Sequence, residues 1–413
     1  MTEKALFPLT ENNLRLQNNV HPEDWQNPKP AERYNLVVIG AGTAGLVTAS
    51  AAAGLGAKVA LVERSLMGGD CLNVGCVPSK GIISAARQAA AVKEAGAFGV
   101  EVPEGTQIDF TTAMERMRKL RADISPLDSA QRFQDLGIDV FLGQAKFVDE
   151  QNVDVNGSVL NFSRAVICSG ARAAAPEIPG LKDVKYLTNE TLFSLTELPQ
   201  EFGIVGAGPV GCEMAQTFAR LGSKVTLVTG KRGILPKEDP DAAGVIRKAM
   251  EKDGVRILTG GRQLEVRKLD DKIRLKIGPD EADVDQLLIA VGRAPNVEGL
   301  NLEEIGVKFS SKGIEVNDRL QTTNKKIFAA GDVCSSYQFT HAADYMARNV
   351  ISNALFYGRS KTSDLIIPWS TYTSPEVAQV GITPQQAEAE GLEIDTYTQS
   401  MEHVDRAILD GET

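Results

Sequence analysis

The chain has 413 residues and a formal net charge of −10. This length is enough for two or three domains, each with its own core. The negative charge argues against nucleic acid or an anionic membrane surface as the main partner, and no apolar run approaches the length of a membrane span. Five cysteines are too few for a disulfide scaffold in a chain of this size, so we expect a cytoplasmic protein with one catalytic cysteine pair.

The first 30 residues are polar and contain Pro22, Pro28 and Pro30. They lack the basic start and the apolar core of a secretory signal. We therefore expect residues 1–30 to form a flexible N-terminal extension.

A dinucleotide-binding unit is predicted next. Residues 35–39 read as a buried strand, residues 40–45 are Gly-Ala-Gly-Thr-Ala-Gly, and an alanine-rich helix leads to a second strand at 58–62. The glycines allow a tight turn and the close approach of a pyrophosphate, while the helix N-terminus supplies amide donors. Glu63, 23 positions after Gly40, suits a carboxylate that accepts hydrogen bonds from an adenosine ribose. The expected contacts are Gly40, Gly42, Gly45 and Glu63.

Two cysteines follow this unit closely. Residues 68–80 read Gly-Gly-Asp-Cys-Leu-Asn-Val-Gly-Cys-Val-Pro-Ser-Lys, with thiols at Cys71 and Cys76. Gly75 permits the non-helical backbone that would bring the two sulfurs within bonding distance. Lys80 shares a helix face with Cys76 if the helix includes both, and a nearby cation lowers a thiol pKa.

A C-x4-C pair has other interpretations. It could be a plain disulfide or two buried thiols, with a helix that begins at Pro78. A zinc site is a weaker alternative, because one pair supplies two ligands and no histidine lies near. Because the pair closely follows one dinucleotide-binding unit, and a second such unit occurs at residues 202–228, we interpret the pair as a redox-active dithiol held against a flavin.

The strand–loop–helix pattern recurs at residues 202–228, with glycines at Gly206, Gly208 and Gly211. The position that corresponds to Glu63 is Thr229, which is followed closely by Lys231 and Arg232. A carboxylate there would bind the ribose of NAD and repel a 2′-phosphate. Its absence beside two cations favours NADPH over NADH, and the alternative is that both cations are ordinary solvated loop charges.

From about Tyr34 to its end the chain resembles the flavoprotein disulfide reductases, or class I pyridine nucleotide-disulfide oxidoreductases. This family includes dihydrolipoamide dehydrogenase, glutathione reductase and mercuric reductase. The amino-acid sequences at 68–80 and 218–226 are most similar to those of mercuric reductase. The resemblance implies an α/β fold with two Rossmann-like three-layer domains and the start of an α+β dimerisation domain. The expected limits are 31–195 and 297–365 for the FAD-binding domain, 196–296 for the NAD(P)-binding domain and 366–413 for the dimerisation domain.

The resemblance also implies roles for individual residues. Cys76 would be the flavin-proximal thiolate, which forms a charge-transfer pair with the oxidised ring, and Cys71 the interchange thiol that attacks the acceptor. Lys80, paired with Glu213, would polarise flavin N5, and Asp332 would contact the ribityl chain. Further contacts with FAD or NADPH are expected from Gly69, Asp70, Ser169, Gly170 and Gly292.

The resemblance does not identify the electron acceptor. We expect the dimerisation domain to continue beyond Thr413, where the family carries its acid/base pair or its metal-relay groups, and the full-length protein to be a homodimer. The acceptor is thus a disulfide or a metal ion such as Hg(II). Alternatives are an NAD-dependent dihydrolipoamide dehydrogenase and a non-catalytic FAD-binding interaction protein; retention of Cys71, Cys76 and Lys80 argues against the latter.

Other residues are assigned structural roles. A charged helix predicted near residues 111–136 would carry a solvated face of Arg116, Arg118, Lys119 and Arg121. Core packing is expected for His341, and buried structural thiols for Cys168, Cys212 and Cys334.

Overall fold

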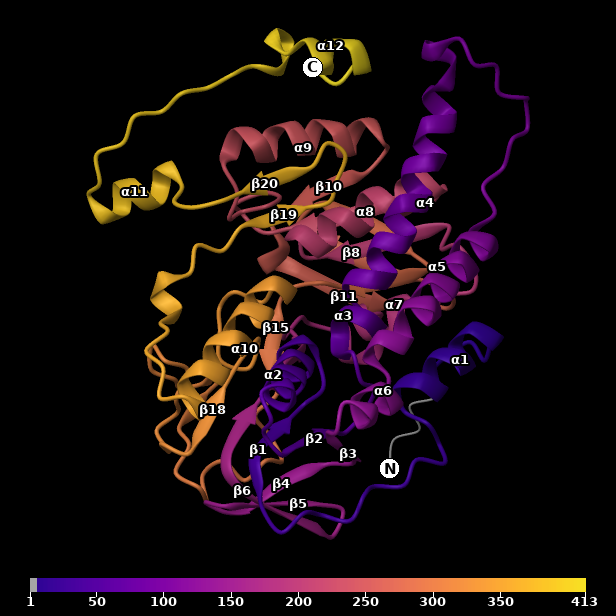
Figure 1. The fold of residues 1–413 in the computed structure, drawn as a ribbon. Coiled ribbons are helices and arrows are strands. Elements are labelled where there is room, and N and C mark those ends of the chain that lie inside the picture. The colour runs from indigo at the N-terminus through magenta and orange to yellow at the C-terminus, as the bar shows by residue number, and fades with distance from the viewer. Residues whose placement is uncertain (1–5) are drawn as a thin grey trace.

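A parallel sheet forms the centre of the lower half of the molecule in Figure 1. The computed structural model describes residues 6–413. The sheet has the order β3-β2-β1-β6, with β18 also paired to β6, and β6 continues into an antiparallel extension with β5 and β4. Leu36, Val37 and Val38 of β1 are fully buried, as expected for a central parallel strand. The strands are β1 (Tyr34–Ile39), β2 (Val59–Glu63), β3 (Asp139–Leu142), β4 (Ala145–Asp149), β5 (Asn152–Val155), β6 (Ser158–Ile167) and β18 (Ile327–Ala329).

A second parallel sheet lies in the upper half and has the order β10-β9-β8-β14. An antiparallel sheet, β11-β12-β13, packs beside it. The chain forms β1 to β6 of the first sheet, then the whole second sheet, and finally returns to the first sheet as β18. The elements are β8 (Glu201–Val205), α8 (Pro209–Leu221), β9 (Lys224–Thr229), α9 (Pro240–Lys252), β10 (Arg256–Thr259), β11 (Leu264–Lys268), β12 (Ile273–Ile277), β13 (Asp280–Val284) and β14 (Gln286–Ile289).

Helices connect and cover the sheets. In Figure 1, α2 and α10 lie side by side against the first sheet, and α4 runs upward from α3 beside α8. The short pair β7–β15 lies at the crossover between the two halves, and β16 with β17 forms a small hairpin that packs on the core of the first sheet. These elements are α2 (Thr43–Gly54), α3 (Gly69–Asn73), α4 (Cys76–Glu94), α5 (Phe110–Ile124), α6 (Ala130–Asp135), β7 (Ala171–Ala173), α7 (Asn189–Leu192), β15 (Arg293–Pro295), β16 (Phe309–Ser310), β17 (Gly313–Ile314) and α10 (Thr340–Leu355).

The charged helix expected near residues 111–136 is two helices, because α5 ends at Ile124 and Pro126 lies in the 3-10 turn before α6. The predicted solvated face is wrong for two of its arginines. Arg118 and Arg121 are buried and their guanidinium groups donate to backbone carbonyls, those of Leu195 and Asn73. Helical spacing does not distinguish a solvated arginine from one that finds such acceptors inside.

Residues 1–5 of the predicted N-terminal extension lie outside the described part of the chain. The rest of the extension is not the flexible segment that we expected. A helix, α1 (Glu11–Val20), begins after the capping residue Thr10. Leu16 and Val20, four residues apart on one face of the helix, are fully buried in the hydrophobic core that covers one face of the first sheet. This burial is the reason why the segment packs on the protein.

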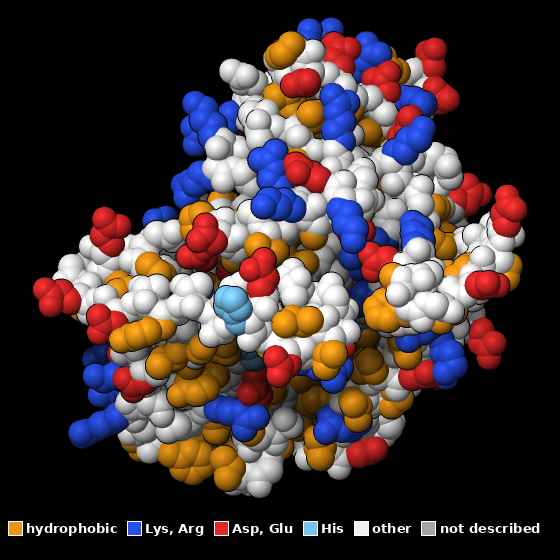
Figure 2. Space-filling model, turned by 90° about the horizontal axis from the view of Figure 1, so that it is seen from above, with side chains coloured by type: hydrophobic (Ala, Val, Ile, Leu, Met, Phe, Trp, Pro, Cys, Tyr) orange, Lys and Arg blue, Asp and Glu red, His pale blue; other side chains and the backbone are white. Residues whose placement is uncertain are grey.

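The C-terminal segment is extended. The hairpin of β19 (Trp369–Thr371) and β20 (Val377–Gln379) lies against the second unit. The helices α11 (Pro384–Glu390) and α12 (Asp405–Asp410) follow and are connected by an extended loop (Figure 1). Seen from this end, charged side chains of both signs alternate with exposed apolar groups (Figure 2). Exposed apolar side chains of the segment include Val380, Leu392, Ile394, Tyr397 and Leu409. Among the helices of residues 6–413, none combines the length and apolarity needed to cross a bilayer.

Candidate redox site

The first glycine loop joins β1 to α2 as predicted, and its three glycines differ in what surrounds them. A Cβ atom built on Gly40 would lie 2.3 Å from the carbonyl oxygen of Cys168, and one on Gly45 would lie 1.8 Å from that of Gly40. These two glycines are required by the packing of the turn itself. A Cβ on Gly42 would meet only the Cα of Gly69, at 3.7 Å.

The second loop repeats this arrangement between β8 and α8. A Cβ on Gly206 would lie 2.3 Å from the oxygen of Ala290, and one on Gly211 would lie 1.8 Å from that of Gly206. A Cβ on Gly208 would meet no protein atom within 4 Å. The middle glycine of the second loop thus leaves open space at the N-terminus of α8, whereas the middle glycine of the first loop is in van der Waals contact with Gly69. The open space at the N-terminus of α8 fits the pyrophosphate of a dinucleotide.

Glu63 ends β2 as predicted. Its carboxylate accepts backbone hydrogen bonds from Ala41 and Ser65, both at 2.7 Å. The carboxylate therefore supports the glycine loop from the side of the second strand. A contact with the ribose remains a prediction.

The cysteine pair lies directly beside the first glycine loop. Gly69 has a positive φ of 57°, and a Cβ there would lie 2.7 Å from the Cα of Gly42, so only glycine allows the two backbones this approach. Cys71 lies on α3, and Cys76 is the first residue of α4. The helix begins two residues earlier than Pro78, and Cys76 and Lys80 are consequently four apart on one helix.

The two thiols are free and interact with each other. The hydrogen bond from Cys71 lowers the pKa of Cys76 to about 6, with further contributions from Thr340, whose Oγ1 lies 3.2 Å from Sγ, and from the charge of Lys80. Partial burial acts in the opposite direction. The pKa of Cys71 is raised, first because it donates to Cys76 and then by burial. These contacts favour a proton on Cys71 and a thiolate at Cys76.

Lys80 and Glu213, which sequence reasoning paired, lie together. Nζ of Lys80 is 3.2 Å from Oε2 of Glu213, and the glutamate is almost fully buried at 5% exposure. The backbone N–H of Tyr372 donates to Oε1 of Glu213 at 2.9 Å, and Lys80 Nζ lies 4.4 Å from the centre of the Tyr372 ring. The start of the C-terminal segment thus closes over the ion pair, a contact that no local sequence signal indicates.

Asp332 lies just beyond β18, as predicted, with a partner that the sequence reasoning missed. Arg293 Nε is 3.3 Å from an Asp332 carboxylate oxygen, and its Nη2 forms an ion pair with Asp70. Burial raises the pKa of Asp332, while Arg293 acts in the opposite direction. The only sequence signal for Arg293 as a binding residue is its position directly after Gly292, close to the end of the apolar strand β14.

The predicted crossover residues meet at the pair β7–β15. Ser169 Oγ donates to the oxygen of Asn296 at 2.7 Å, and Asn296 Nδ2 donates to the oxygen of Ser169 at 2.9 Å. Gly170 and Gly292 both have positive φ, 66° and 136°. These bonds join the first sheet to the chain that returns from the second.

The cations expected to select NADPH lie after β9. Thr229 is the last residue of the strand, is buried, and donates its hydroxyl to the oxygen of Gly233. Lys231 and Arg232 are exposed. The turn after β10 adjoins Thr229, whose oxygen accepts from Gly260 at 3.0 Å, so Arg262 in this turn is a further nearby cation.

The remaining titratable candidates are three cysteines and His341, and His341 directly follows Thr340, whose Oγ1 lies 3.2 Å from Sγ of Cys76. Burial raises the pKa of Cys168 and raises that of Cys212 to about 12, in agreement with buried structural thiols. Cys334 differs from the expectation, because it is only partly buried; desolvation and the charge of Asp332 raise its pKa to about 12. Core packing is wrong for His341, which is exposed and bonds to the oxygen of Pro368 at 2.6 Å.

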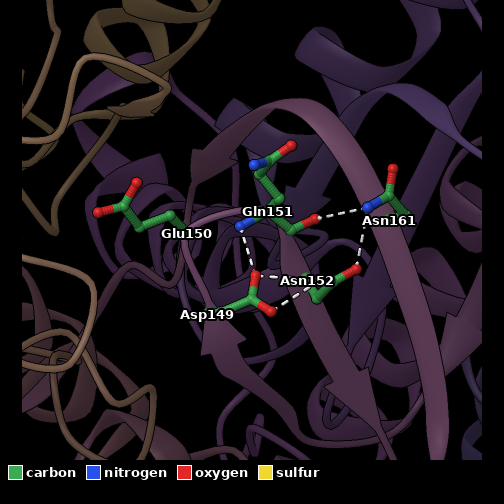
Figure 3. A pocket seen from close by; sticks show the side chains of 5 residues that line it. All are labelled: Asp149, Glu150, Gln151, Asn152 and Asn161. Atoms are coloured by element: carbon green, nitrogen blue, oxygen red, sulfur yellow. Dashed lines mark hydrogen bonds between the residues drawn. The ribbon is translucent and has the colours of Figure 1, made fainter.

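A surface hollow of about 310 Å³ lies at the β4–β5 turn (Figure 3). Its lining residues mainly bond to one another: Asp149 accepts from the backbone of Gln151 at 2.7 Å and from Asn152, and Asn161 donates to Asn152. Glu150 points away from these residues. The bonds are those of a closed turn and indicate no chemistry.

The site as a whole defines a class: two dinucleotide loops and a cysteine pair with a stabilised thiolate. The family model for the pyridine nucleotide-disulphide oxidoreductases matches residues 34–347, and the model for the dimerisation domain of the same family matches residues 367–413. The chain belongs to this family, whose members are FAD-containing enzymes that use NADH or NADPH.

Named relatives include mercuric reductases and dihydrolipoyl dehydrogenases. The chain is 34% identical to mercuric reductase of Bacillus cereus over 100% of its length and 66% of that protein. It is also 34% identical to dihydrolipoyl dehydrogenase of Bacillus subtilis, over 85% of this chain and 78% of that protein. The chain thus spans slightly less than two thirds of the Bacillus cereus protein.

A solved structure supports the fold. The HOCl-induced flavoprotein disulfide reductase RclA of Escherichia coli superimposes with a TM-score of 0.82 at 31% identity, over 92% of this chain and 85% of RclA. The predicted α/β class, with two Rossmann-like units and the start of a dimerisation domain, is confirmed by this likeness and by the family matches.

Proposed function

We propose that the protein transfers electrons from NADPH through FAD to the Cys71–Cys76 pair, and from there to a disulfide or a metal ion. The observation that carries this proposal is the arrangement around the pair: Thr340 Oγ1 lies 3.2 Å from Sγ of Cys76, and Lys80, four residues along the same helix, forms an ion pair with the buried Glu213. These contacts and the neighbouring thiol of Cys71 lower the pKa of Cys76. A plain structural disulfide requires neither the low pKa nor the lysine.

Two sets of residues would hold the cofactors. The loop at 40–45, with Glu63 and Asp332, would hold FAD, and the loop at 206–211 would hold NADPH, with the 2′-phosphate near Lys231 and Arg232. When bound, FAD accepts a hydride from the pyridine nucleotide and passes two electrons to a disulfide. The open space beside Gly208 supports the assignment of the second loop, and the strand–loop–helix arrangement shared by both loops supports the assignment of the first.

The protein's own groups support thiol–disulfide exchange at the cysteine pair. The attacking species in this exchange is a thiolate, so the proton of Cys71 first passes to Sγ of Cys76. Sγ of Cys71 then attacks one sulfur of an acceptor disulfide, which breaks the acceptor S–S bond and forms a mixed disulfide, and the released acceptor sulfur takes the proton from Cys76. The thiolate of Cys76 then attacks Sγ of Cys71 and closes the Cys71–Cys76 disulfide. The two acceptor sulfurs leave as thiols, with the proton of Cys71 and one proton from solvent. Lys80 remains beside Cys76 to favour its thiolate.

The relatives divide over the acceptor. Mercuric reductases support a soft metal ion, which two thiols suit, and RclA is a disulfide reductase that has also been solved as a Cu(II) complex. The second candidate function is an NAD-dependent dihydrolipoyl dehydrogenase, favoured by the relative from Bacillus subtilis. Thr229 in place of an acid argues against it. The match to a dimerisation domain supports a homodimer.

An anaerobic screen tests the proposal. The FAD-loaded protein is mixed with NADPH or NADH, and lipoamide disulfide, glutathione disulfide or Hg(II) is then added. We expect rapid flavin reduction by NADPH and turnover with one acceptor, and Cys76→Ser and Cys71→Ser should abolish turnover without preventing reduction of the flavin. Full turnover by either serine variant would refute the role of the pair, and equal rates with NADH at low concentration would refute the cofactor preference.

A further inference from the structure

The N-terminal helix α1 contacts the cysteine segment, although the family match begins only at residue 34. Leu16 and Val20 of α1 lie in the same core as Met67 and Leu72, and all four are at most 1% exposed. Leu72 is the residue after Cys71. The helix and the segment that presents the first thiol therefore share one hydrophobic core, and α1 itself lies mainly against α5 and the 3-10 turn that follows it.

A buried arginine connects α1 to the backbone between the two cysteines. Nη2 of Arg121 donates to Oδ1 of Asn13 at 2.7 Å, and Nη1 donates to the carbonyl oxygen of Asn73 at 2.5 Å. Asn13 and Arg121 are 1% and 2% exposed. Asn13 is held in turn, because its Nδ2 donates to the oxygen of Pro8 at 2.8 Å. The guanidinium thus spans from the extension to the residue that ends α3.

The same helix also holds the other end of the cysteine segment. The backbone N–H of Met67 donates to the oxygen of Val20 at 3.1 Å, and His21 bonds to the oxygen of Ser65. Asn73 Nδ2 closes the loop by donating to the oxygen of Met67 at 3.0 Å. Residues 65–73 are therefore fixed on both sides of the turn that carries Cys71.

We propose that α1, through Asn13 and Arg121, positions the Cys71–Cys76 pair and sets how readily it forms its disulfide. The inference rests on the proposed function of the pair. Two sulfurs that are held in contact have a high effective concentration for each other, whereas a free end of α3 would allow Cys71 to move away. Loosening the Asn13–Arg121–Asn73 connection should hence favour the dithiol over the disulfide. Asn13 and Arg121 are positioning residues, since they touch neither sulfur.

The test is a redox titration of the whole FAD-loaded protein. Wild type and Asn13→Ala are equilibrated with mixtures of reduced and oxidised glutathione, quenched by alkylation, and the oxidation of Cys71 and Cys76 is read by peptide mass spectrometry. The reaction is disulfide plus two glutathione to dithiol plus glutathione disulfide. We expect Asn13→Ala to favour the dithiol roughly tenfold, because a hydrogen bond to a charged group contributes on that order. This corresponds to about 30 mV for a two-electron couple.

Three further variants separate positioning from general loosening. Asn13→Asp gives up the donor to Pro8 but keeps an oxygen for Arg121, so it should retain the wild-type equilibrium if the contact with Arg121 is the one that matters. Arg121→Lys cannot reach both acceptors and should shift it as Asn13→Ala does. Arg15→Ala is the matched control, because Arg15 ties α1 to Asp123 of α5 at the exposed surface, at 2.5 Å, outside the buried connection.

The outcomes distinguish the two proposals. An unchanged equilibrium in Asn13→Ala, or an equal shift in Arg15→Ala, would overturn the positioning role. If wild type forms no Cys71–Cys76 disulfide at any glutathione ratio, the proposed function itself fails.

Discussion

The hydrogen bond from Thr340 to Cys76 should set much of the thiolate's stability. The pKa of Cys76 is lowered from an ordinary 9.0 to about 6, and Thr340 contributes to this beside Cys71 and Lys80. Thr340→Val removes the hydroxyl but keeps the side-chain shape. A hydrogen bond to a charged group contributes about 1.5–3 kcal/mol, and one pKa unit corresponds to about 1.4 kcal/mol. We therefore expect the pKa of Cys76 to rise to about 7–8.

The consequence at neutral pH is large. A thiol with a pKa of about 6 is about 90% thiolate at pH 7, whereas a pKa of about 7–8 leaves between about 10 and 50%. Because the folded pKa lies below the ordinary value, the thiolate is lost as the pH falls through about 6 in wild type. In the valine variant this loss should begin at higher pH.

The assay is the rate of alkylation of Cys76 by iodoacetamide as a function of pH, read by peptide mass spectrometry, with ultraviolet thiolate absorbance as a second readout. Thr340→Ser keeps the hydroxyl and serves as the control, with a titration curve like that of wild type. The reasoning is refuted if Thr340→Val titrates with the wild-type midpoint, or if the serine variant shifts as far as the valine variant.

Two further predictions concern the second dinucleotide loop. Gly208→Ala should leave the thermal unfolding midpoint nearly unchanged, because the added Cβ meets no protein atom within 4 Å. It should weaken pyridine nucleotide binding in calorimetry, because the Cβ would occupy space that the nucleotide needs. Gly211→Ala should destabilise the fold, because its Cβ would lie 1.8 Å from a carbonyl oxygen. Unaltered nucleotide affinity in Gly208→Ala would contradict the assignment of the loop. Thr229→Glu combined with Lys231→Gln and Arg232→Gln should shift the ratio of kcat/KM values from NADPH toward NADH by roughly tenfold to a hundredfold. An unshifted ratio would mean that the loop charges are merely solvated.

Local patterns in the sequence were sufficient for much of the fold. Each glycine loop stands between a β-branched strand and a helix, and all three elements are set by neighbours close in sequence, so both units could be predicted nearly to the residue. The Cys71–Cys76 spacing and the helix that carries Lys80 are equally local. The pairing of Lys80 with Glu213 was available only through the family resemblance, since 133 residues separate them.

The sequence by itself thus determined the α/β class, the two dinucleotide loops and the cysteine pair as the chemical centre. Only the tertiary structure decided which groups surround that centre. Thr340 reaches Cys76 across 264 residues and Tyr372 reaches Glu213 across 159. Arg121 carries the same helical spacing as its solvated neighbours, but it turns inward because Asn13 and Asn73 offer buried acceptors there. Such contacts depend on where distant segments dock, and no pattern of adjacent residues encodes that docking.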